Sequence, residues 1–164
     1  MILVLDASAL IVLARVGYLD LLRQSGDEIY IPQAVYNEVA GRAPDRPGSR
    51  EIAQATWLRR KKVRDREAVT RLKHRLGWGE VEAIVLAGEL GETVLVLDDG
   101  TARRAAEQEG RTVVGLLGLL LSYKERGIVR VLKPLLDAMI AAGFFIDNAL
   151  HRHIVRKAGE EPSP

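Results

Sequence analysis

The 164-residue chain has no cysteine. This absence excludes a disulfide scaffold, thiolate zinc sites, iron–sulfur clusters and a cysteine nucleophile. A chain without thiols fits a reducing compartment, so we expect a cytoplasmic protein.

Long hydrophobic runs are also missing. The most apolar stretch, from Val113 to Tyr123, contains two glycines and is too short to cross a hydrocarbon layer of about 30 Å. Met1 is followed at once by the apolar segment Ile2 to Leu5, with no preceding basic residues that would indicate a signal peptide. The sequence therefore predicts no membrane anchor.

The chain has little net charge. A value of +2 is a weak argument for a polyanionic partner. The distribution is uneven, however, because the segment from Arg59 to Arg75 holds nine basic residues against only Asp65 and Glu67. Two interpretations carry equal weight at this point: an ordinary solvated surface, or a patch that binds phosphate groups.

Apolar segments alternate with helical ones along the chain. Ile2 to Leu5 and Thr93 to Leu97 are typical of buried parallel strands, and Ile29 to Ile31 and Thr112 to Val114 are shorter candidates. This alternation predicts a three-layer α/β/α sandwich with a mostly parallel central sheet. We expect one domain over residues 1–158, in which residues 127–158 form a C-terminal helical appendage, and a disordered tail over residues 159–164.

Four local features complete the expected fold. Ser8 is a candidate cap for the first helix, and the proline- and glycine-rich segment from Gly41 to Ser49 is expected to be a loop. Trp57 to Val63 is a candidate edge strand. The two phenylalanines, Phe144 and Phe145, are expected to dock the appendage on the core or on a second subunit.

Acidic residues follow two of the expected strands directly. Asp6 ends the first, and the pair Asp98 and Asp99 ends the strand that begins at Thr93. Functional groups of parallel sheets collect at the carboxyl ends of the strands. One such aspartate is more often a helix cap, but two strands that end in the same way favour a shared site.

Two glutamates are further candidates. Glu38 lies at the margin of the apolar face of the helix that follows Pro32, although a solvated glutamate is the simpler interpretation. Glu80 continues the apolar stripe of Ala83 and Ile84, and a role at the positive end of the helix competes with a role as ligand.

A cluster of these acids would need a counter-charge. Two carboxylates 4 Å apart repel by roughly 4 kcal/mol at an effective dielectric constant of about 20, so protons or a cation must be present. Oxygen ligands favour Mg²⁺ or Mn²⁺ over zinc, and these ions suit hydrolysis of a phosphodiester. His74, His151 and His153 show no zinc-binding spacing.

Four ordered segments resemble the motifs of PIN domains. They are, in chain order, VLDASALI from Val4, IPQAVYNEV from Ile31, GEVEAI from Gly79 and LVLDDGTAR from Leu95. The later segments Gly115 to Gly118 and Gly143-Phe144 resemble a branch of PIN-like proteins that is often described as predicted toxins. The resemblance covers nearly the whole chain.

The resemblance implies a metal-dependent endoribonuclease similar to the VapC-type toxins of type II toxin–antitoxin pairs. It implies that Asp6, Glu38 and Glu80 are catalytic metal ligands, and that Asp99 is the fourth acid, with Asp98 as the alternative. Ser8 matches a position that helps to hold a metal-bound water, a role that competes with helix capping. A cognate antitoxin and a homodimer are further implied partners.

In the expected mechanism, Mg²⁺ or Mn²⁺ held by these acids activates water for in-line attack on RNA. Basic side chains would position the RNA backbone, and Arg103 is the closest candidate in sequence to the fourth motif. The other candidates are Arg59 to Lys62, Arg42, Arg46 and Arg50.

Two rival interpretations remain. A PIN-fold module that binds or assembles without catalysis is the first, although all four motif positions are acidic. A Mg²⁺ phosphohydrolase or receiver-like domain is the second. A phosphohydrolase of this type would have a second aspartate two residues after Asp6, but this chain has Ser8 there. A receiver domain would have its acid pair after the first strand, but here the pair is Asp98 and Asp99.

Overall fold

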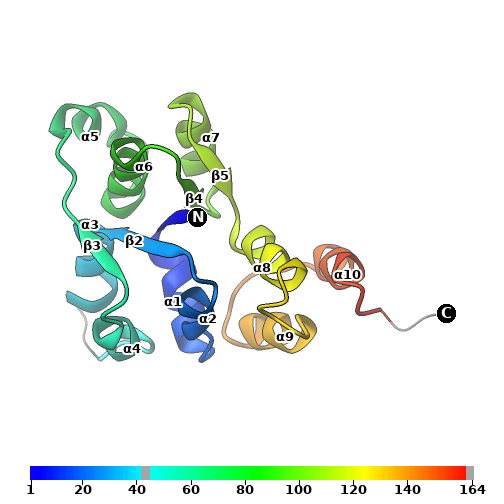
Figure 1. The fold of residues 1–164 in the computed structure, drawn as a ribbon. Helices are drawn as coiled ribbons and strands as arrows, with labels where there is room; N and C mark the ends of the chain where they lie inside the picture. The colour runs from blue at the N-terminus through cyan, green and yellow to red at the C-terminus, as the bar shows by residue number, and fades with distance from the viewer. Residues whose placement is uncertain (42–44, 162–164) are drawn as a thin grey trace.

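The computed structural model describes residues 1–41 and 45–161. Its centre is a sheet of five strands, all parallel, in the order β3-β2-β1-β4-β5. The strands are β1 (Ile2–Leu5), β2 (Glu28–Pro32), β3 (Arg59–Lys61), β4 (Val94–Val96) and β5 (Thr112–Val114). Helices cover both faces, as Figure 1 shows. The expected three-layer α/β/α architecture is confirmed, and so is the edge strand near Trp57.

Alternate side chains of the strands enter two separate cores. In β1, Leu3 and Leu5 pack in the first core and Val4 in the second. The helices of the first core are α1 (Ala7–Arg15), α2 (Asp20–Gln24), α3 (Gln33–Tyr36), α4 (Ser49–Gln54), α8 (Leu116–Glu125), α9 (Lys133–Ala141) and α10 (Asn148–Lys157). Those of the second are α5 (Arg66–Leu72), α6 (Trp78–Leu90) and α7 (Gly100–Gln108). This alternation is why β1 and β4 are apolar throughout, whereas the edge strand β3 is basic and mostly exposed.

The first helix is capped by a different residue from the one expected. Asp6, and not Ser8, is the N-cap of α1, and its carboxylate accepts a hydrogen bond from the Ala9 N–H at 3.1 Å. Ser8 lies one residue inside the helix, where its hydroxyl donates to Asp6 at 3.4 Å. Aspartate is as good a cap as serine, and Asp6 follows the last strand residue, Leu5, directly.

The segment after β2 approaches α6 very closely. It consists of the short helix α3 (Gln33–Tyr36) and a π-helical turn (Asn37–Gly41), and Pro32 precedes the first helical residue. A Cβ at Gly79 of α6 would lie 2.9 Å from Glu38 Oε2 and 3.2 Å from a Val35 methyl carbon. A Cβ at this position would therefore displace the Glu38 carboxylate and press on Val35.

The expected loop from Gly41 to Ser49 is shorter than the sequence suggests. Residues 42–44, which include Arg42, lie outside the described part of the chain. Ser49 already begins α4, a helix that the sequence pattern did not reveal. Gly48 precedes it with a φ of +90°, and a Cβ there would lie 2.9 Å from the Ala14 Cβ. Close packing of this turn on α1 therefore requires glycine.

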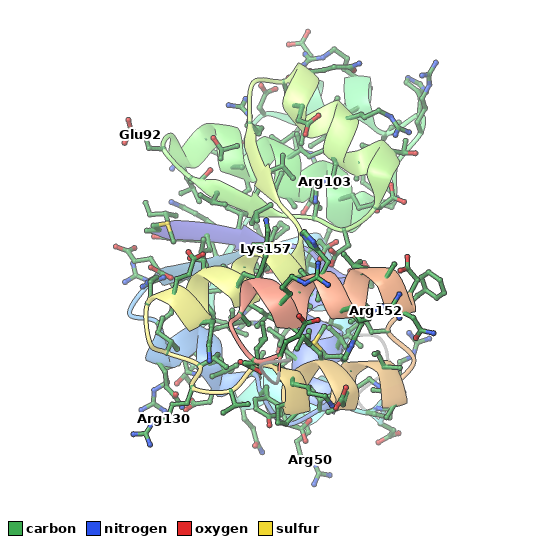
Figure 2. All side chains as sticks on the ribbon, turned by 90° about the vertical axis from the view of Figure 1, so that its right-hand side faces the viewer. Arg50, Glu92, Arg103, Arg130, Arg152 and Lys157 are labelled. Carbon is green, nitrogen blue, oxygen red and sulfur yellow. The ribbon has the colours of Figure 1, made fainter. Side chains whose placement is uncertain are left out.

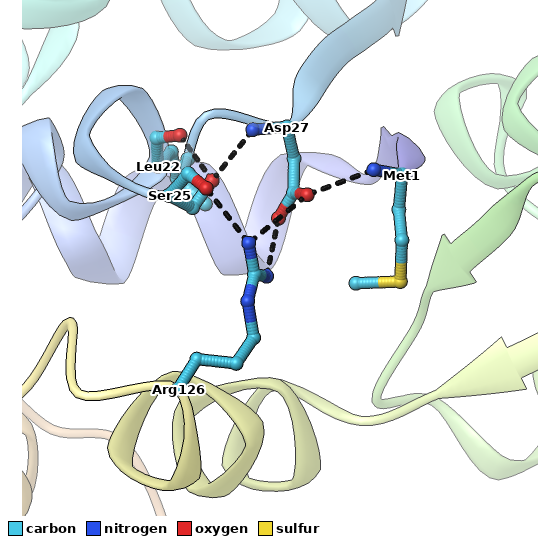
Figure 3. Close-up of polar contacts among 5 residues, drawn as sticks. All are labelled: Met1, Leu22, Ser25, Asp27 and Arg126. Atoms are coloured by element: carbon cyan, nitrogen blue, oxygen red, sulfur yellow. Dashed lines mark hydrogen bonds and ion pairs between the residues drawn. The ribbon is translucent and has the colours of Figure 1, made fainter.

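A partly buried ion pair joins α8 to the amino-terminal end of β2 (Figure 3). Arg126 donates to both carboxylate oxygens of Asp27, at 2.8 and 3.3 Å, and to the Ser25 carbonyl at 2.7 Å. The Met1 amine pairs with the same carboxylate at 2.9 Å. These contacts stabilise the junction between the sheet and the C-terminal helices.

The C-terminal helices pack on the first core through Leu136, Met139 and Ile154. Phe144 contributes to this packing, whereas Phe145 is 87% exposed and does not dock on the core as expected. No helix of the described residues is long and apolar enough to span a bilayer.

The first residues of the expected disordered tail are instead held by the fold. Glu160 accepts the Leu132 and Lys133 N–H groups at the start of α9 and pairs with Lys124 at 2.9 Å. Residues 162–164 lie outside the described residues. The expected fraying at Glu160 is therefore wrong, because the free N–H groups at a helix start need acceptors.

Candidate metal centre at the carboxyl edge of the sheet

Asp6 stands at the carboxyl end of the central strand β1 and is only 5% exposed. Its pKa is raised to about 7, mainly by burial and further by the negative charges of Asp98 and Glu80, while hydrogen bonds from the Ala9 N–H and the Ser8 hydroxyl act in the lowering direction. Among the described residues, Ser8 is the only side-chain hydrogen-bond donor to this carboxylate. No basic side chain of that part of the chain pairs with Asp6, so its ionisation is less favourable than that of an ordinary aspartate.

Asp98 lies two residues after the end of the neighbouring strand β4. Its Oδ1 accepts the Leu116 N–H at 3.0 Å, at the N-terminus of α8, while its buried Oδ2 has no hydrogen-bond partner among the described residues. Burial raises the pKa of Asp98, although Leu116 and Arg103 act in the opposite direction. A carboxylate oxygen that is buried and unpartnered is costly unless something else binds it.

Gly115 gives Asp98 the room that it needs. A Cβ at this position would lie 3.0 Å from both Asp98 Oδ1 and the Arg103 Nη1. Arg103 itself donates to the Leu97 carbonyl at 3.3 Å, so its guanidinium is held beside the aspartate. In the view onto α10, Arg103 lies in the layer of α7, above Lys157 and Arg152 of α10 (Figure 2).

Asp99, the fourth acid by resemblance, is placed differently from Asp98. It is exposed, and its carboxylate caps α7 by accepting the Ala102 N–H at 2.8 Å. The structure brings Asp98, and not Asp99, to Asp6. A position one residue later on an extended segment places the side chain on the other side of the chain.

Of the two glutamates, Glu80 lies close to Asp6. Glu80, in the first turn of α6, accepts the Gly77 N–H at 3.0 Å and is close enough to Asp6 to raise its pKa. Glu38 is exposed in the π-helical turn, with Oε2 beside Gly79. Two hollows meet at Glu38: one of about 590 Å³ toward Trp78 and one of about 250 Å³ that Arg15 and Arg46 also line.

The acids at this edge fit a divalent cation by their chemistry. In the described ranges, no three acidic or histidine side chains are yet gathered closely enough to hold a metal ion. The donor set is nevertheless suitable, because the unpartnered Asp98 Oδ2 and the uncompensated Asp6 are the carboxylate oxygens that Mg²⁺ and Mn²⁺ prefer. Mg²⁺ sites often use only one or two carboxylates together with water. The residues therefore fit the ion.

The basic residues between Arg59 and Arg75 lie on the edge strand β3, on α5 and on the segments next to them. Arg59 pairs with Glu28 at 3.0 Å, and Arg60 stacks on the Tyr36 ring with its guanidinium 4.0 Å from the ring centre. Arg66 pairs with Glu82 at 3.2 Å. Several members of the run therefore have partners within the protein, and their exposed positions leave them free to contact phosphates as well.

Glu82 is a buried acid that the sequence patterns did not reveal. It is 8% exposed on α6, where one oxygen accepts the Ala34 N–H at 3.0 Å and the other pairs with Arg66. An acid within the apolar run of α6 was the available signal. Trp78, an exposed aromatic in a chain with 5% aromatic residues, was a second.

The fold is a parallel sheet between two layers of helices, with acids at the carboxyl edge of the central strands. It belongs to the class of α/β proteins that bind ligands at that edge. A family model described as a PIN domain matches residues 2–160. The chain therefore belongs to the PIN-domain family, whose members are generally nucleases that use divalent metals. Comparison with curated proteins and with solved structures gave no significant match.

Proposed function

We propose that this protein is an endoribonuclease that hydrolyses RNA phosphodiester bonds with Mg²⁺ or Mn²⁺. The observation that supports this most strongly is the aspartate pair at the carboxyl edge. Asp6 is buried beside the charge of Asp98, and Asp98 Oδ2 has no partner among the described residues. A stability optimum alone would not favour this arrangement.

Each residue of the proposed site has a distinct task. Asp6 and Asp98 are the proposed inner ligands, and Ser8 orients the Asp6 carboxylate. Glu80 and Glu38 complete the negative rim on the side of the larger hollow. When bound there, Mg²⁺ or Mn²⁺ supplies Lewis-acid activation of water and neutralises charge on the phosphate.

Asp98 takes the place of Asp99 in this proposal. The Leu116 N–H fixes Asp98 toward Asp6, and Arg103 is held beside it, where a phosphodiester oxygen would need a positive charge. Asp99 contributes through the start of α7. This choice selects one of the two alternatives that the sequence left open.

The biological setting is proposed from the motif resemblance. We infer that the chain is the toxin of a type II toxin–antitoxin pair that acts on RNA in the cytoplasm, as a homodimer that a cognate antitoxin inhibits. A small DNA-binding protein encoded next to this chain would support this setting. Cleavage of RNA without any such neighbour would limit the proposal to the nuclease activity.

The test is cleavage of a mixed RNA pool by purified protein with Mn²⁺ or Mg²⁺, with EDTA and the Asp6→Asn variant as controls. Asparagine retains the helix cap, so the fold is kept while a charged ligand is removed. We expect cleavage that both controls abolish. Activity that survives in Asp6→Asn would contradict the proposal, and a folded protein that neither cleaves RNA nor binds metal would favour the non-catalytic module.

A further inference from the structure

A second feature of the carboxyl edge is the hollow of about 590 Å³ beside the acids. Its walls come from the segment after β2 and from the first turn of α6, and Arg66 closes one side. Glu38 belongs to both the hollow and the acid rim, and Gly77 joins the hollow to Glu80. A ligand in this hollow would therefore contact Glu38 and lie close to the Glu80 carboxylate.

Trp78 is the most unusual residue of the hollow. It is 55% exposed, although tryptophan is normally highly buried, and it stands at the first position of α6, two residues before Glu80. The Lys73 ammonium lies 5.6 Å from its ring. An exposed indole beside a positive charge is the combination on which single-stranded nucleic acids stack their bases.

A pair of amides also lines the hollow. The Gln33 Nε2 donates to Asn37 Oδ1 at 2.8 Å, which fixes both side chains at the border of the hollow. Apart from this bond, the Gln33 carbonyl acceptor and the remaining amide donors of both residues have no partner within residues 1–41 and 45–161. Donors and acceptors that are held in one direction can read the edge of a base, as side-chain amides do in nucleic-acid complexes.

The floor of the hollow is also fixed. Glu82 is buried beneath it and holds both the start of α3, through the Ala34 N–H, and the Arg66 guanidinium. Arg66 is bound through one nitrogen and is otherwise exposed, so its remaining donors are available to a phosphate. An aromatic surface, a pair of amides and an arginine therefore line one hollow of the size that small ligands occupy.

We propose that this hollow binds one unpaired base of the RNA substrate next to the bond that is cleaved. The base stacks on Trp78, the amides of Gln33 and Asn37 contact its edge, and Arg66 and Lys73 contact neighbouring phosphates. The proposal rests on the proposed function, from which it takes RNA as the ligand. According to this proposal, the hollow determines the sequence specificity of RNA cleavage.

The chain offers a direct reporter, because it has two tryptophans. Trp57 lines a different hollow beside α1 and α4. In the double variant Asp6→Asn, Trp57→Phe, Trp78 is the sole indole and RNA is not consumed. We expect saturable quenching of its fluorescence by single-stranded RNA of mixed sequence, and none by duplex RNA. The matched variant Asp6→Asn, Trp78→Phe should show no quenching.

Affinity and cleavage give a second readout. Trp78→Ala should weaken binding of single-stranded RNA between about 5- and 150-fold, the range expected for one lost base stack, and Trp78→Phe should recover part of it. Asn37→Ala should change which sites in the RNA pool are cut. Trp57→Ala, with circular dichroism to verify folding in every variant, serves as the control.

The outcomes separate this inference from the proposed function. Quenching of Trp78 by single-stranded RNA in a protein that cuts no RNA would support the base site and contradict the nuclease. Cleavage with no quenching, or with an unchanged KM and cutting pattern in Trp78→Ala, would overturn the base site and leave the nuclease in place. Equal quenching by duplex RNA would also overturn it.

Discussion

Two enclosed aspartates, Asp6 and Asp27, differ in what surrounds their carboxylates. The Asp27 side chain is 2% exposed, and although burial raises its pKa, hydrogen bonds from Arg126 and the Met1 amine outweigh this and lower it. Asp6 is nearly as buried, but its neighbours are other acids and its pKa rises to about 7.

The comparison shows that burial of an acid does not by itself indicate function. The negative charge of Asp27 is neutralised by Arg126 and the Met1 amine, and its contacts join the sheet to α8 (Figure 3). Asp6 lacks such a partner within the described residues. When Asp6 is ionised, the folded protein is therefore less stable than it would be with a neutral side chain at this position. An uncompensated acid beside a second one, Asp98, favours a site that binds a cation.

The largest expected effect separates the two adjacent acids at the end of β4. Asp98→Asn should lower metal-dependent RNA cleavage at least about a hundredfold, because it removes a charge from the proposed inner ligands. Asp99→Asn should change it by only a few fold, since asparagine still caps α7. Rates of the two variants under identical metal concentrations decide the matter, and the reverse order would return the fourth position to Asp99.

The second prediction concerns stability and pH. The pKa of Asp6 is raised on folding from 3.8 to about 7, so the stability that its neutral form provides is present below about pH 4 and is lost as the pH rises through 7. An asparagine side chain cannot ionise. Denaturant unfolding in EDTA should therefore show Asp6→Asn to be more stable than the wild type by about 2–4 kcal/mol at pH 8, with a difference that shrinks toward pH 4. An equal or less stable variant at pH 8 would contradict the raised pKa.

The third prediction sharpens the contrast at Asp27. Asp27→Ala removes the partner of Arg126, which is partly exposed, and should lower the free energy of unfolding by about 2–3 kcal/mol. RNA cleavage per folded molecule should not change. Asp20→Ala is the control, because its pair with Arg23 is exposed and should contribute little. A loss of cleavage without a loss of stability would instead show that Asp27 takes part in the reaction.

The sequence predicts the local features of this contrast but not those that depend on contacts between distant residues. The parallel sheet follows from the alternation of apolar strands with helices, and the position of Asp6 follows from an apolar run that ends in an acid; these expectations agree with the structure. The pairing of Asp98 with Leu116 could not be foreseen, because it depends on a residue 18 positions away. The pattern of adjacent aspartates does not show which one faces Asp6.

Other features depended equally on tertiary contacts. Glu160 was expected in the tail, yet it caps α9, and this cap depends on a helix 27 residues earlier in the chain. The burial of Glu82 depends on how α3 docks against α6. Trp78 was visible in the sequence, but its exposure was not.

The smallest expected effect concerns Gly115, which leaves space for Asp98 and Arg103. Gly115→Ala would bring a Cβ to 3.0 Å from both groups and should lower cleavage between about 3- and 30-fold through a small displacement of the aspartate. Gly100→Ala is the control, because its nearest neighbour would lie at an ordinary 3.5 Å. Equal rates for wild type and Gly115→Ala would show that this contact does not position the site.

The central claim is that Asp6 and Asp98 form a divalent-metal site. The most direct test is calorimetric titration of Mn²⁺ into the wild-type protein and into Asp6→Asn, Asp98→Asn and Asp99→Asn. We predict saturable binding in the wild type and in Asp99→Asn, and its loss in Asp6→Asn and Asp98→Asn. Unchanged binding in Asp6→Asn, or none in the folded wild-type protein, would contradict the claim.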